Sequence, residues 1–257
     1  MPLDPVPSPA RSFWSAPLDG RVSLVTGAGR GIGRACALAF AEAGSDVIAV
    51  ARTAAELEQL EAEGQGRIRG WCEDVTTDAF LARVEALERL DVLLNNAGMN
   101  RPLPIQDVDT ATLDRMLDLN VRAVYRTSQA AVRVFLRNAR GGCIVHMSSQ
   151  MGHVGAADRT VYCLTKHAIE GLTKAMAVEL APRRIRVNSV APTFIDTPMT
   201  QPMFEDPAFR RAVLDNIPLG RLGQVEDVVG AVMFLISPAA SLVTGHSLRV
   251  DGGWTAR

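Results

Sequence analysis

The sequence is short of clustered cysteines, of net charge and of long hydrophobic runs, and each shortage excludes a class of protein. The four cysteines lie far apart and form no CxxC motif or Cys/His cluster, which argues against a disulfide framework and against a bound metal: Cys36, Cys72, Cys143 and Cys163. No apolar run approaches the ~18 residues that a membrane span needs. The formal net charge of -1 offers no long-range field to nucleic acid or to an anionic membrane, so neither is an expected partner.

The first 18 residues differ in composition from the rest of the chain. Residues 1–18 are rich in proline and serine and lack both hydrophobic periodicity and the apolar core of a secretion signal, which predicts a flexible tail. Residues 19–257 fall within the size of one α/β domain, and a hydrophobic content of 47% is enough for one large core. The cysteine usage fits a reducing compartment, so we expect a cytoplasmic protein.

Short apolar runs alternate with amphipathic stretches from Arg21 onward. Seven of the runs are predicted to be strands: Val22–Thr26, Asp46–Ala51, Ile68–Cys72, Val92–Asn95, Ile144–Met147, Val187–Ala191 and Ser247–Val250. The predicted helices between them include Arg34–Ala43, Ala54–Glu63, Thr112–Arg137, Val161–Ala181 and Val225–Ile236. This alternation predicts a doubly wound, Rossmann-like α/β fold with a seven-stranded parallel sheet and helices on both faces. Ligands of such sheets bind outside the carboxyl ends of the strands.

A glycine-rich turn joins the first predicted strand to the first helix, with the sequence TGAGRGIG at residues 26–33. Glycines permit a tight turn and a close backbone approach, and a helix N-terminus offers unpaired N–H groups to a pyrophosphate. The turn residues predicted to bind a dinucleotide are Gly27, Arg30, Gly31, Ile32 and Gly33. The alternative is an ordinary glycine-rich loop.

The end of the second strand lacks the carboxylate that would bind the ribose hydroxyls of NAD. Arg52 stands there instead, and its guanidinium, with that of Arg30, can bind a 2′-phosphate. NADP(H) is therefore favoured as cofactor, with NAD(H) possible; the alternative is that Arg52 is simply solvated. Further residues follow the third and fourth strands where an adenine and its ribose would bind: Asp74, Val75, Asn96, Ala97 and Gly98.

A serine, a tyrosine and a lysine follow the fifth predicted strand. The pair Ser148-Ser149 comes directly after it, and Tyr162 and Lys166 have the i,i+4 spacing that places two side chains on one helix face. A phenol with a pKa of about 10 is a poor base near neutrality, and an adjacent ammonium favours the phenolate. An isolated YxxxK would be explained more simply by packing of the tyrosine and solvation of the lysine.

These motifs, in this order, resemble those of the short-chain dehydrogenases/reductases over residues 18–257. Besides the residues above, the resemblance rests on LDLNVRAVY around Asn120, RVNSVAP at 186–192 and the ending VDGGW. It implies a catalytic tetrad of Asn120, Ser149, Tyr162 and Lys166. In that tetrad Ser149 would bind the substrate oxygen, Tyr162 would transfer its proton, Lys166 would bind the nicotinamide ribose and Asn120 would hold a water.

The loop after the sixth strand carries one departure from the family pattern. The resemblance implies that the Ile195 backbone and the Thr197 hydroxyl bind the nicotinamide carboxamide. Thr193, however, replaces the glycine that is usual after Pro192, which puts the backbone contacts of this loop in question.

The resemblance implies an NADP(H)-preferring oxidoreductase that transfers a hydride between the nicotinamide and a carbonyl or secondary alcohol. Its nearest comparisons are 3-oxoacyl-carrier-protein reductases and gluconate-type sugar-acid dehydrogenases, so a 3-oxoacyl thioester and a sugar acid or polyol both stay open as substrates. Ser149, Gln150, Met151 and Tyr162 are the predicted substrate contacts. The pocket walls are expected to come from residues 99–101, 150–153 and 194–205, in which Arg101, His153, Phe194, Met199 and Met203 are further candidates. The alternatives are a catalytically silent nucleotide-binding scaffold or sensor, and an epimerase or dehydratase that uses the cofactor transiently.

Self-association is also expected. The helical segments 112–137 and 161–181 carry apolar and small residues on more than one face. In the family resembled, the equivalent helices pair across a two-fold axis and the C-terminal segment, around Trp254 here, joins a second interface. We therefore expect a homotetramer whose other partner is a small-molecule substrate.

Overall fold

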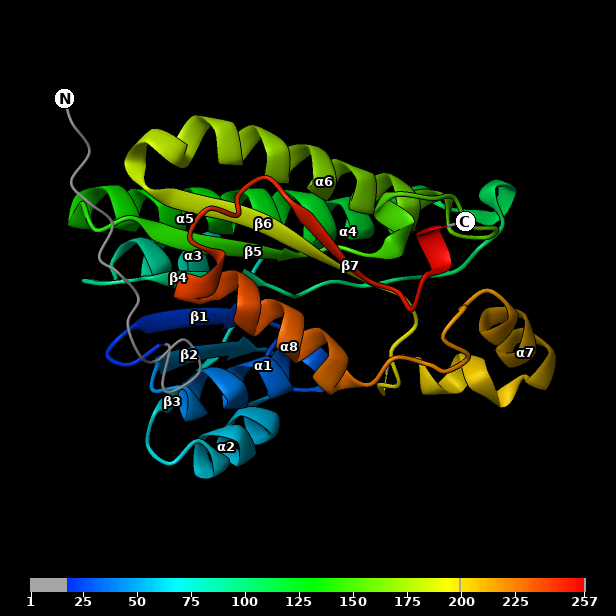
Figure 1. Ribbon diagram of the computed structural model, residues 1–257, viewed down its shortest axis with the longest axis horizontal. Helices are drawn as coiled ribbons and strands as arrows, with labels where there is room; N and C mark the ends of the chain where they lie inside the picture. The colour runs from blue at the N-terminus through cyan, green and yellow to red at the C-terminus, as the bar shows by residue number, and fades with distance from the viewer. Residues whose placement is uncertain (1–17, 199, 257) are drawn as a thin grey trace.

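A seven-stranded parallel sheet with helices on both faces forms the centre of the protein (Figure 1). The computed structural model describes residues 18–198 and 200–256. The strand order is β3-β2-β1-β4-β5-β6-β7, with the bounds β1 Val22–Thr26, β2 Asp46–Ala51, β3 Ile68–Cys72, β4 Val92–Asn95, β5 Gly142–Met147, β6 Ile185–Pro192 and β7 Ser247–Val250. The predicted fold class and strands are confirmed, although β5 and β6 are longer than predicted.

Eight α-helices connect or flank these strands in the described ranges. Their bounds are α1 Gly31–Glu42, α2 Ala54–Glu63, α3 Asp78–Glu85, α4 Thr110–Leu117, α5 Ala123–Asn138, α6 Thr160–Leu180, α7 Pro207–Asp215 and α8 Val225–Ile236. The long helix predicted over 112–137 is interrupted by a π-helical turn at Asp118–Arg122, which separates α4 from α5. Turns of this kind occur frequently at functional sites.

Alternate residues of the central strands supply two separate cores. In β1, Val25 packs in the core shared with α1, α2 and α8, whereas the preceding Leu24 packs in the core shared with α3, α5 and α6. Successive side chains of a strand point to opposite faces, so a strand covered on both sides needs apolar residues at every position. This explains why the central strands read as continuous apolar runs.

The folded domain includes Leu18. This residue, which the sequence analysis placed at the end of the tail, is fully buried, and its backbone N–H donates to the Ala43 carbonyl at 3.1 Å. The rest of the predicted tail, residues 1–17, lies outside the described residues, as does Met199.

The strand order reverses between β1 and β4, because the chain proceeds from β1 outward to β3 and then returns to pair β4 with β1. This reversal opens a crevice at the carboxyl ends of the two strands, where α/β sheets bind ligands. The segment around α7 projects beyond this same edge of the sheet (Figure 1). The glycine-rich turn after β1 and the loop after β4 therefore meet at one site.

Candidate active site

Asn96 fastens the glycine-rich turn to the end of β4. Its Nδ2 donates to the carbonyls of Thr26 at 3.0 Å and Gly27 at 3.1 Å, and the Thr26 hydroxyl accepts the backbone N–H of Asn96 at 3.0 Å. Gly27 has a φ of +66°, and a Cβ on Gly33 would lie 2.3 Å from the Gly27 carbonyl oxygen. Both positions therefore require glycine. Without side chains there, a phosphate group can approach the backbone N–H groups at the N-terminus of α1 closely.

A groove of about 540 Å³ runs from this turn across the ends of β2 and β3. The predicted cofactor residues that line it are Gly27, Arg30, Gly31, Ile32, Arg52, Asp74, Val75, Asn96, Ala97, Gly98 and Thr197. Gly33 lies behind the turn, where it allows the close packing described above. The groove also contains Thr53, Glu56 and Arg115, which the sequence analysis did not single out.

Arg52 lies on the exposed side of the groove, near Asp74. Burial raises the pKa of the Asp74 carboxyl, but hydrogen bonds from Thr76 and the charge of Arg52 outweigh it and hold that pKa below its usual value. The groove thus offers peptide N–H groups at a helix N-terminus, three guanidinium groups and four carboxylates, namely Arg30, Arg52, Arg115, Glu56, Glu73, Asp74 and Asp118. Backbone N–H groups and carboxylates at the ends of these strands fit a dinucleotide.

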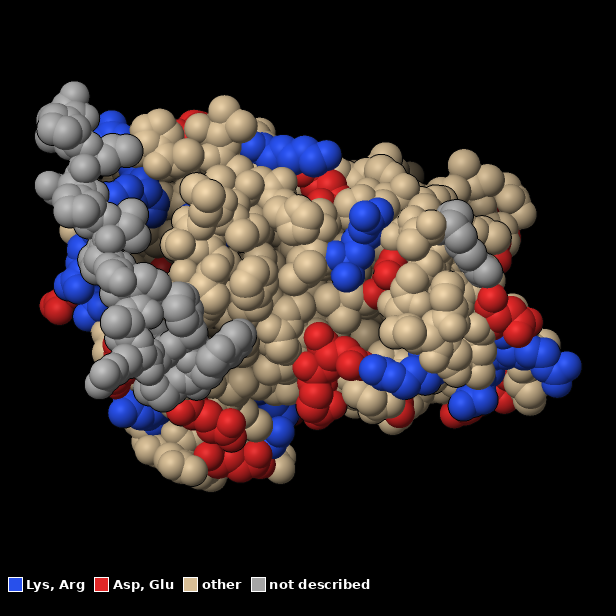
Figure 2. Space-filling view, viewed as in Figure 1, with Lys and Arg blue, Asp and Glu red and all other residues tan. Residues whose placement is uncertain are grey.

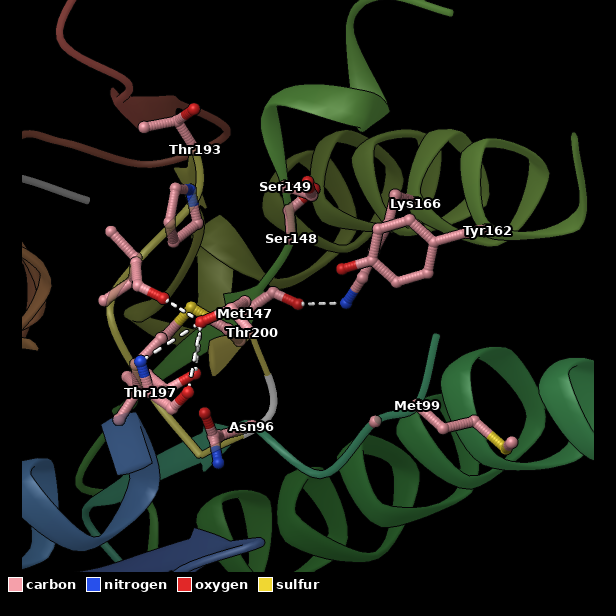
Figure 3. Close-up of a pocket in the computed structure, with 14 residues that line it drawn as sticks. Asn96, Met99, Met147, Ser148, Ser149, Tyr162, Lys166, Thr193, Thr197 and Thr200 are labelled. Atoms are coloured by element: carbon pink, nitrogen blue, oxygen red, sulfur yellow. Dashed lines mark hydrogen bonds between the residues drawn. The ribbon is translucent and has the colours of Figure 1, made fainter. Parts of the chain in front are cut away.

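A smaller pocket of about 140 Å³ adjoins the groove and holds the catalytic candidates Ser149, Tyr162 and Lys166 (Figure 3). The two cavities share Ile32, Asn96, Gly98, Met99 and Thr197. Figure 3 shows the Tyr162 hydroxyl and the Lys166 amino group pointing to the same side, toward Met147. The i,i+4 spacing in α6 has therefore placed them together as predicted.

Lys166 is almost completely enclosed. It is 6% exposed, its Nζ donates to the Met147 carbonyl at 2.7 Å, and this Nζ lies 5.5 Å from the centre of the Tyr162 ring. Burial lowers the pKa of Lys166 to about 8, although the charge of Glu170 opposes the shift. The ammonium is therefore poised to gain or lose its proton close to neutral pH.

Tyr162 corrects one expectation from the sequence. Burial raises the pKa of its phenol to about 12, against the lowering effect of the hydrogen bond with Ser149. Lys166 was expected to lower this pKa, but the desolvation of the phenol dominates, and the charge that opposes the rise is that of Arg159. Tyr162 is therefore a protonated acid at neutral pH, able to donate its proton.

Glu170 lies one helical turn beyond Lys166 and anchors a buried polar cluster. Its carboxylate accepts hydrogen bonds from the Ser189 hydroxyl of β6, at 2.9 and 3.1 Å to its two oxygens, and from the Ser247 hydroxyl of β7 at 3.1 Å. His153 Nε2 hydrogen-bonds Ser247 Oγ at 2.9 Å. His153, a sequence candidate for substrate contact, is thus engaged in this cluster and does not line the pocket.

Asn120 lies within the π-helical turn and is fully buried. Its Oδ1 accepts the Met99 N–H and its Nδ2 donates to the Met99 carbonyl, both at 2.8 Å, and Nδ2 also donates to Thr165 Oγ1 at 3.2 Å. The side chain thereby fastens the loop after β4 to α6. It does not line the pocket itself, so its side chain acts through the position of Met99.

The loop after β6 forms the wall opposite Lys166 (Figure 3). Ile195 and Thr197 line the pocket as predicted, and so does Thr200 of the predicted wall segment 194–205. The Thr200 hydroxyl donates to the Ile195 carbonyl at 2.5 Å and accepts the Thr197 N–H at 3.1 Å. Thr193 also lines the pocket, and its hydroxyl has no partner among the described residues.

Two predicted substrate contacts are not on this wall. Gln150 and Met151 belong to the 3-10 helix Gln150–Gly152 that follows β5; both are buried and do not line the pocket, although Ser149 beside them does. Arg101 is exposed and likewise does not line it. Met147 also lines the pocket, and the sequence analysis missed it because it predicted this residue only as part of the strand core.

Within residues 18–198 and 200–256, no group of three or more His, Cys, Asp or Glu side chains could hold a metal ion. None of the helices in these ranges has the length and hydropathy that a membrane-spanning helix needs.

Comparisons with known proteins agree with this geometry. The family model described as enoyl-(acyl carrier protein) reductase matches residues 27–255. The chain is 44% identical to L-xylulose reductase of Bos taurus over 93% of its length and 98% of the relative, and 39% identical to the 3-oxoacyl-[acyl-carrier-protein] reductase FabG of Thermotoga maritima over 92% and 98%. A gluconate 5-dehydrogenase from Burkholderia cenocepacia, solved in complex with NADP and tartrate, matches with a TM-score of 0.89 and 30% identity over 96% of this chain and 100% of that one.

The chain belongs to the short-chain dehydrogenase/reductase family. It is accordingly an NAD(P)-dependent oxidoreductase that acts on alcohol or carbonyl groups.

Proposed function

We propose that the protein is an NADP(H)-dependent reductase of a short, polyhydroxylated ketone, such as a ketose or a keto sugar acid. The observation that carries this proposal is the meeting of Ser149, Tyr162 and Lys166 in one pocket that opens onto the dinucleotide groove. A scaffold or sensor without catalysis would not need this arrangement. Turnover of NADPH with candidate ketones tests the proposal.

The residues of the two cavities have complementary tasks. The turn from Gly31 would hold the pyrophosphate of the cofactor, and Arg52 with Arg30 would hold the 2′-phosphate. Asp74 and Val75 would contact the adenosine. Ile195 and Thr197 would bind the carboxamide of the nicotinamide. When bound, the nicotinamide supplies the hydride to the carbonyl carbon. Ser149 donates a hydrogen bond to the carbonyl oxygen, Tyr162 gives that oxygen its proton, and Lys166 binds the ribose and stabilises the phenolate that remains. Because the Asn120 side chain is engaged with Met99 and Thr165, a water of the proton relay would be held by the Asn120 backbone carbonyl.

The size and lining of the pocket support a sugar-sized substrate over a 3-oxoacyl thioester. The cavity of about 140 Å³ is small, and Ser149, Thr193 and Thr200 bring hydroxyl groups to its wall. Hydroxyl-rich substrates are recognised by such polar groups, because an analogue that lacks them leaves the wall unpaired. The 44% identity to an L-xylulose reductase supports the same substrate class. Assays with L-xylulose, 5-keto-gluconate and an acetoacetyl thioester distinguish the alternatives.

Arg52 determines the cofactor preference in this proposal. We predict that the protein binds NADPH more tightly than NADH and that Arg52→Asp reverses the order, because the variant loses a cation and gains a charge that repels the 2′-phosphate. Titration of both cofactors measures the preference. Arg183→Asp, an exposed position at the far end of α6, makes the same change of charge and should keep the original order. Equal affinities of the parent protein for the two cofactors would refute the prediction.

The raised pKa of Tyr162 and the lowered pKa of Lys166 predict different pH profiles for the two directions. Oxidation needs the phenolate, so its rate should rise from pH 7 to about pH 8, at up to roughly tenfold per pH unit because the Tyr162 pKa is about 12, and level off above about pH 8, where Lys166 loses its charge. Reduction needs the protonated phenol and should be level up to about pH 8. It should decline above pH 8, where Lys166 loses the charge that stabilises the phenolate. Steady-state rates in both directions from pH 6 to 10 test this; parallel profiles would contradict it.

The proposed assembly is a homotetramer in the cytoplasm. Apolar side chains are exposed on α5 and α6, including Tyr125 and Val178, and Figure 2 shows a broad area with few charged side chains over the middle of α8 and the beginning of β7, bounded by charged side chains toward one end of each element. Two apolar faces of one chain support two different two-fold interfaces. Light scattering should give about four times the chain mass of 27.6 kDa, and Val178→Glu should reduce it. A monomer at micromolar concentration would refute the assembly.

A further inference from the structure

A buried arginine lies at the beginning of α6, outside the set of residues assigned so far. Arg159 is 8% exposed. Its Nη1 donates to the adjacent Asp158 backbone carbonyl at 3.3 Å, its Nη2 lies 4.0 Å from Met203 Sδ, and its Nε has no hydrogen-bond partner. Across the part of the chain that the structure describes, no carboxylate lies within 4.0 Å of this guanidinium.

A buried guanidinium without a close counter-ion should bind an anion favourably. An arginine stays charged at every physiological pH, and a buried charge is costly unless it is paired. Burial lowers the pKa of Arg159, while Asp158, Cys163 and Tyr162 act in the opposite direction. Of these three groups only Asp158 is a carboxylate, and its side chain is exposed. The protein therefore keeps a desolvated cation beside its catalytic tyrosine without a close counter-ion among the described residues.

The position of Arg159 relates it to the catalytic pocket. It precedes Tyr162 by three residues, and its contact Met203 belongs to the 3-10 helix Gln201–Glu205 that directly follows Thr200. Tyr162 and Thr200 both line the pocket. Arg159 does not itself line the pocket, but its guanidinium lies between the segments that carry Tyr162 and Thr200, at the side of the pocket where a longer substrate would extend.

The first turn of α6 adds to the attraction for an anion. Arg159 occupies the N-cap position of α6, but its side chain does not cap the helix. The first N–H groups of a helix have no partner within the helix, and a helix of 21 residues adds the partial positive charge of its dipole at this end.

We propose that Arg159 binds a carboxylate of the substrate, so that the enzyme selects a hydroxy or keto acid and holds its reacting carbon at Tyr162. The planar guanidinium can form two parallel hydrogen bonds to a carboxylate, which fixes the orientation of the substrate as well as its charge. This inference deepens the proposed function, on which it rests, and it narrows the substrate from polyhydroxylated ketones in general to their acids.

Direct binding tests the inference without turnover. Tartrate and threitol have the same four-carbon diol core, but tartrate carries carboxylates where threitol carries hydroxymethyl groups. Calorimetry on the complex with NADP⁺ should show that tartrate binds roughly 10- to 100-fold more tightly than threitol. Equal affinity for the two probes, or no detectable binding of tartrate, would overturn the inference.

Variants locate the effect at Arg159. Arg159→Gln should weaken tartrate binding roughly 10- to 100-fold and leave the affinities for threitol and NADP⁺ unchanged, whereas Arg159→Lys should retain part of the difference. Arg183→Gln, which removes one exposed cation at the other end of α6, should bind both probes like the parent protein. Unchanged tartrate binding by Arg159→Gln would overturn the assignment even if tartrate binds the parent tightly.

The failure of this inference and the failure of the proposed function give different results. If the parent protein reduces L-xylulose with NADPH but binds tartrate no better than threitol, the reductase proposal stands and the role of Arg159 is wrong. If tartrate binding depends on Arg159 but no ketone or keto acid is reduced, the anion site stands and the reductase proposal is wrong.

Discussion

Tyr162→Phe is expected to lower turnover by at least about 10²- to 10⁴-fold, the usual contribution of general acid–base catalysis. The substitution removes only the hydroxyl that gives the substrate oxygen its proton, and Ser149, its neighbour in the pocket, keeps its own hydrogen bond from the Met151 N–H at 3.1 Å. The affinity for NADPH and the thermal unfolding should therefore remain close to those of the parent protein. Steady-state kinetics with the best substrate of the assay panel, together with a cofactor titration, measure both effects.

The chain offers a matched control for this variant. Tyr125 is its only other tyrosine, and it is 52% exposed on α5, away from the pocket. Tyr125→Phe removes the same hydroxyl and should leave turnover unchanged. Near-normal turnover of Tyr162→Phe would mean that the proton comes from another group, and the assignment of Tyr162 would have to be abandoned.

Lys166→Ala is expected to affect both binding and chemistry. The variant loses the proposed ribose contact, so the affinity for the cofactor should fall roughly 10-fold or more, in keeping with a charge-assisted hydrogen bond. It also loses the cation that stabilises the Tyr162 phenolate, so turnover at saturating cofactor should fall by a further factor on the order of 10². The decline of reduction above about pH 8 should disappear, because the group responsible for it is gone.

The only other lysine provides the comparison for Lys166. Lys174 lies two turns further along α6 and is exposed. Lys174→Ala removes the same side chain from the same helix and should preserve both the affinity for the cofactor and the pH profile. A Lys166→Ala variant that kept normal cofactor affinity would contradict the proposed ribose contact, whatever its turnover.

Position 166 carries a lysine although nearly all basic residues of the chain are arginines. Of its 27 basic residues only Lys166 and Lys174 are lysines. A lysine loses its charge readily when buried, whereas arginine does not, and lysine carries its donors on a compact head group. The enclosed site between Met147 and the Tyr162 ring, with a pKa lowered to about 8, uses both properties.

The sequence was most informative where backbone conformation and helix periodicity determine the result. Gly27 and Gly33 permit no side chain, and the four-residue spacing of Tyr162 and Lys166 leaves only one relative placement on a helix. Local patterns of this kind can be read without knowledge of the tertiary structure. The same holds for the strands, whose apolar runs follow from burial on both faces of the sheet.

The sequence was least informative where tertiary packing decides what a side chain does. Gln150 and Met151, the sequence neighbours of Ser149, were expected in the pocket, but the 3-10 turn that they form after β5 buries both side chains away from it. The direction in which the pKa of Tyr162 shifts depends on the balance between burial and neighbouring charges, and the four-residue spacing of Tyr162 and Lys166 does not reveal that balance. Arg159 has no motif at all. Its proposed role as the anion-binding residue rests on the burial of its side chain and on its unpartnered Nε, and neither can be read from the sequence.

Net reduction of a small hydroxylated ketone with NADPH consumes the cofactor, so the nicotinamide absorbance follows the proposed reaction itself. With L-xylulose or 5-keto-gluconate in excess, we expect a sustained loss of NADPH absorbance, in step with formation of the alcohol and absent in Tyr162→Phe. An epimerase or dehydratase that uses the cofactor transiently would convert substrate with no lasting change in absorbance. Product formation without that change, or no consumption of NADPH with any ketone or keto acid, would contradict the account.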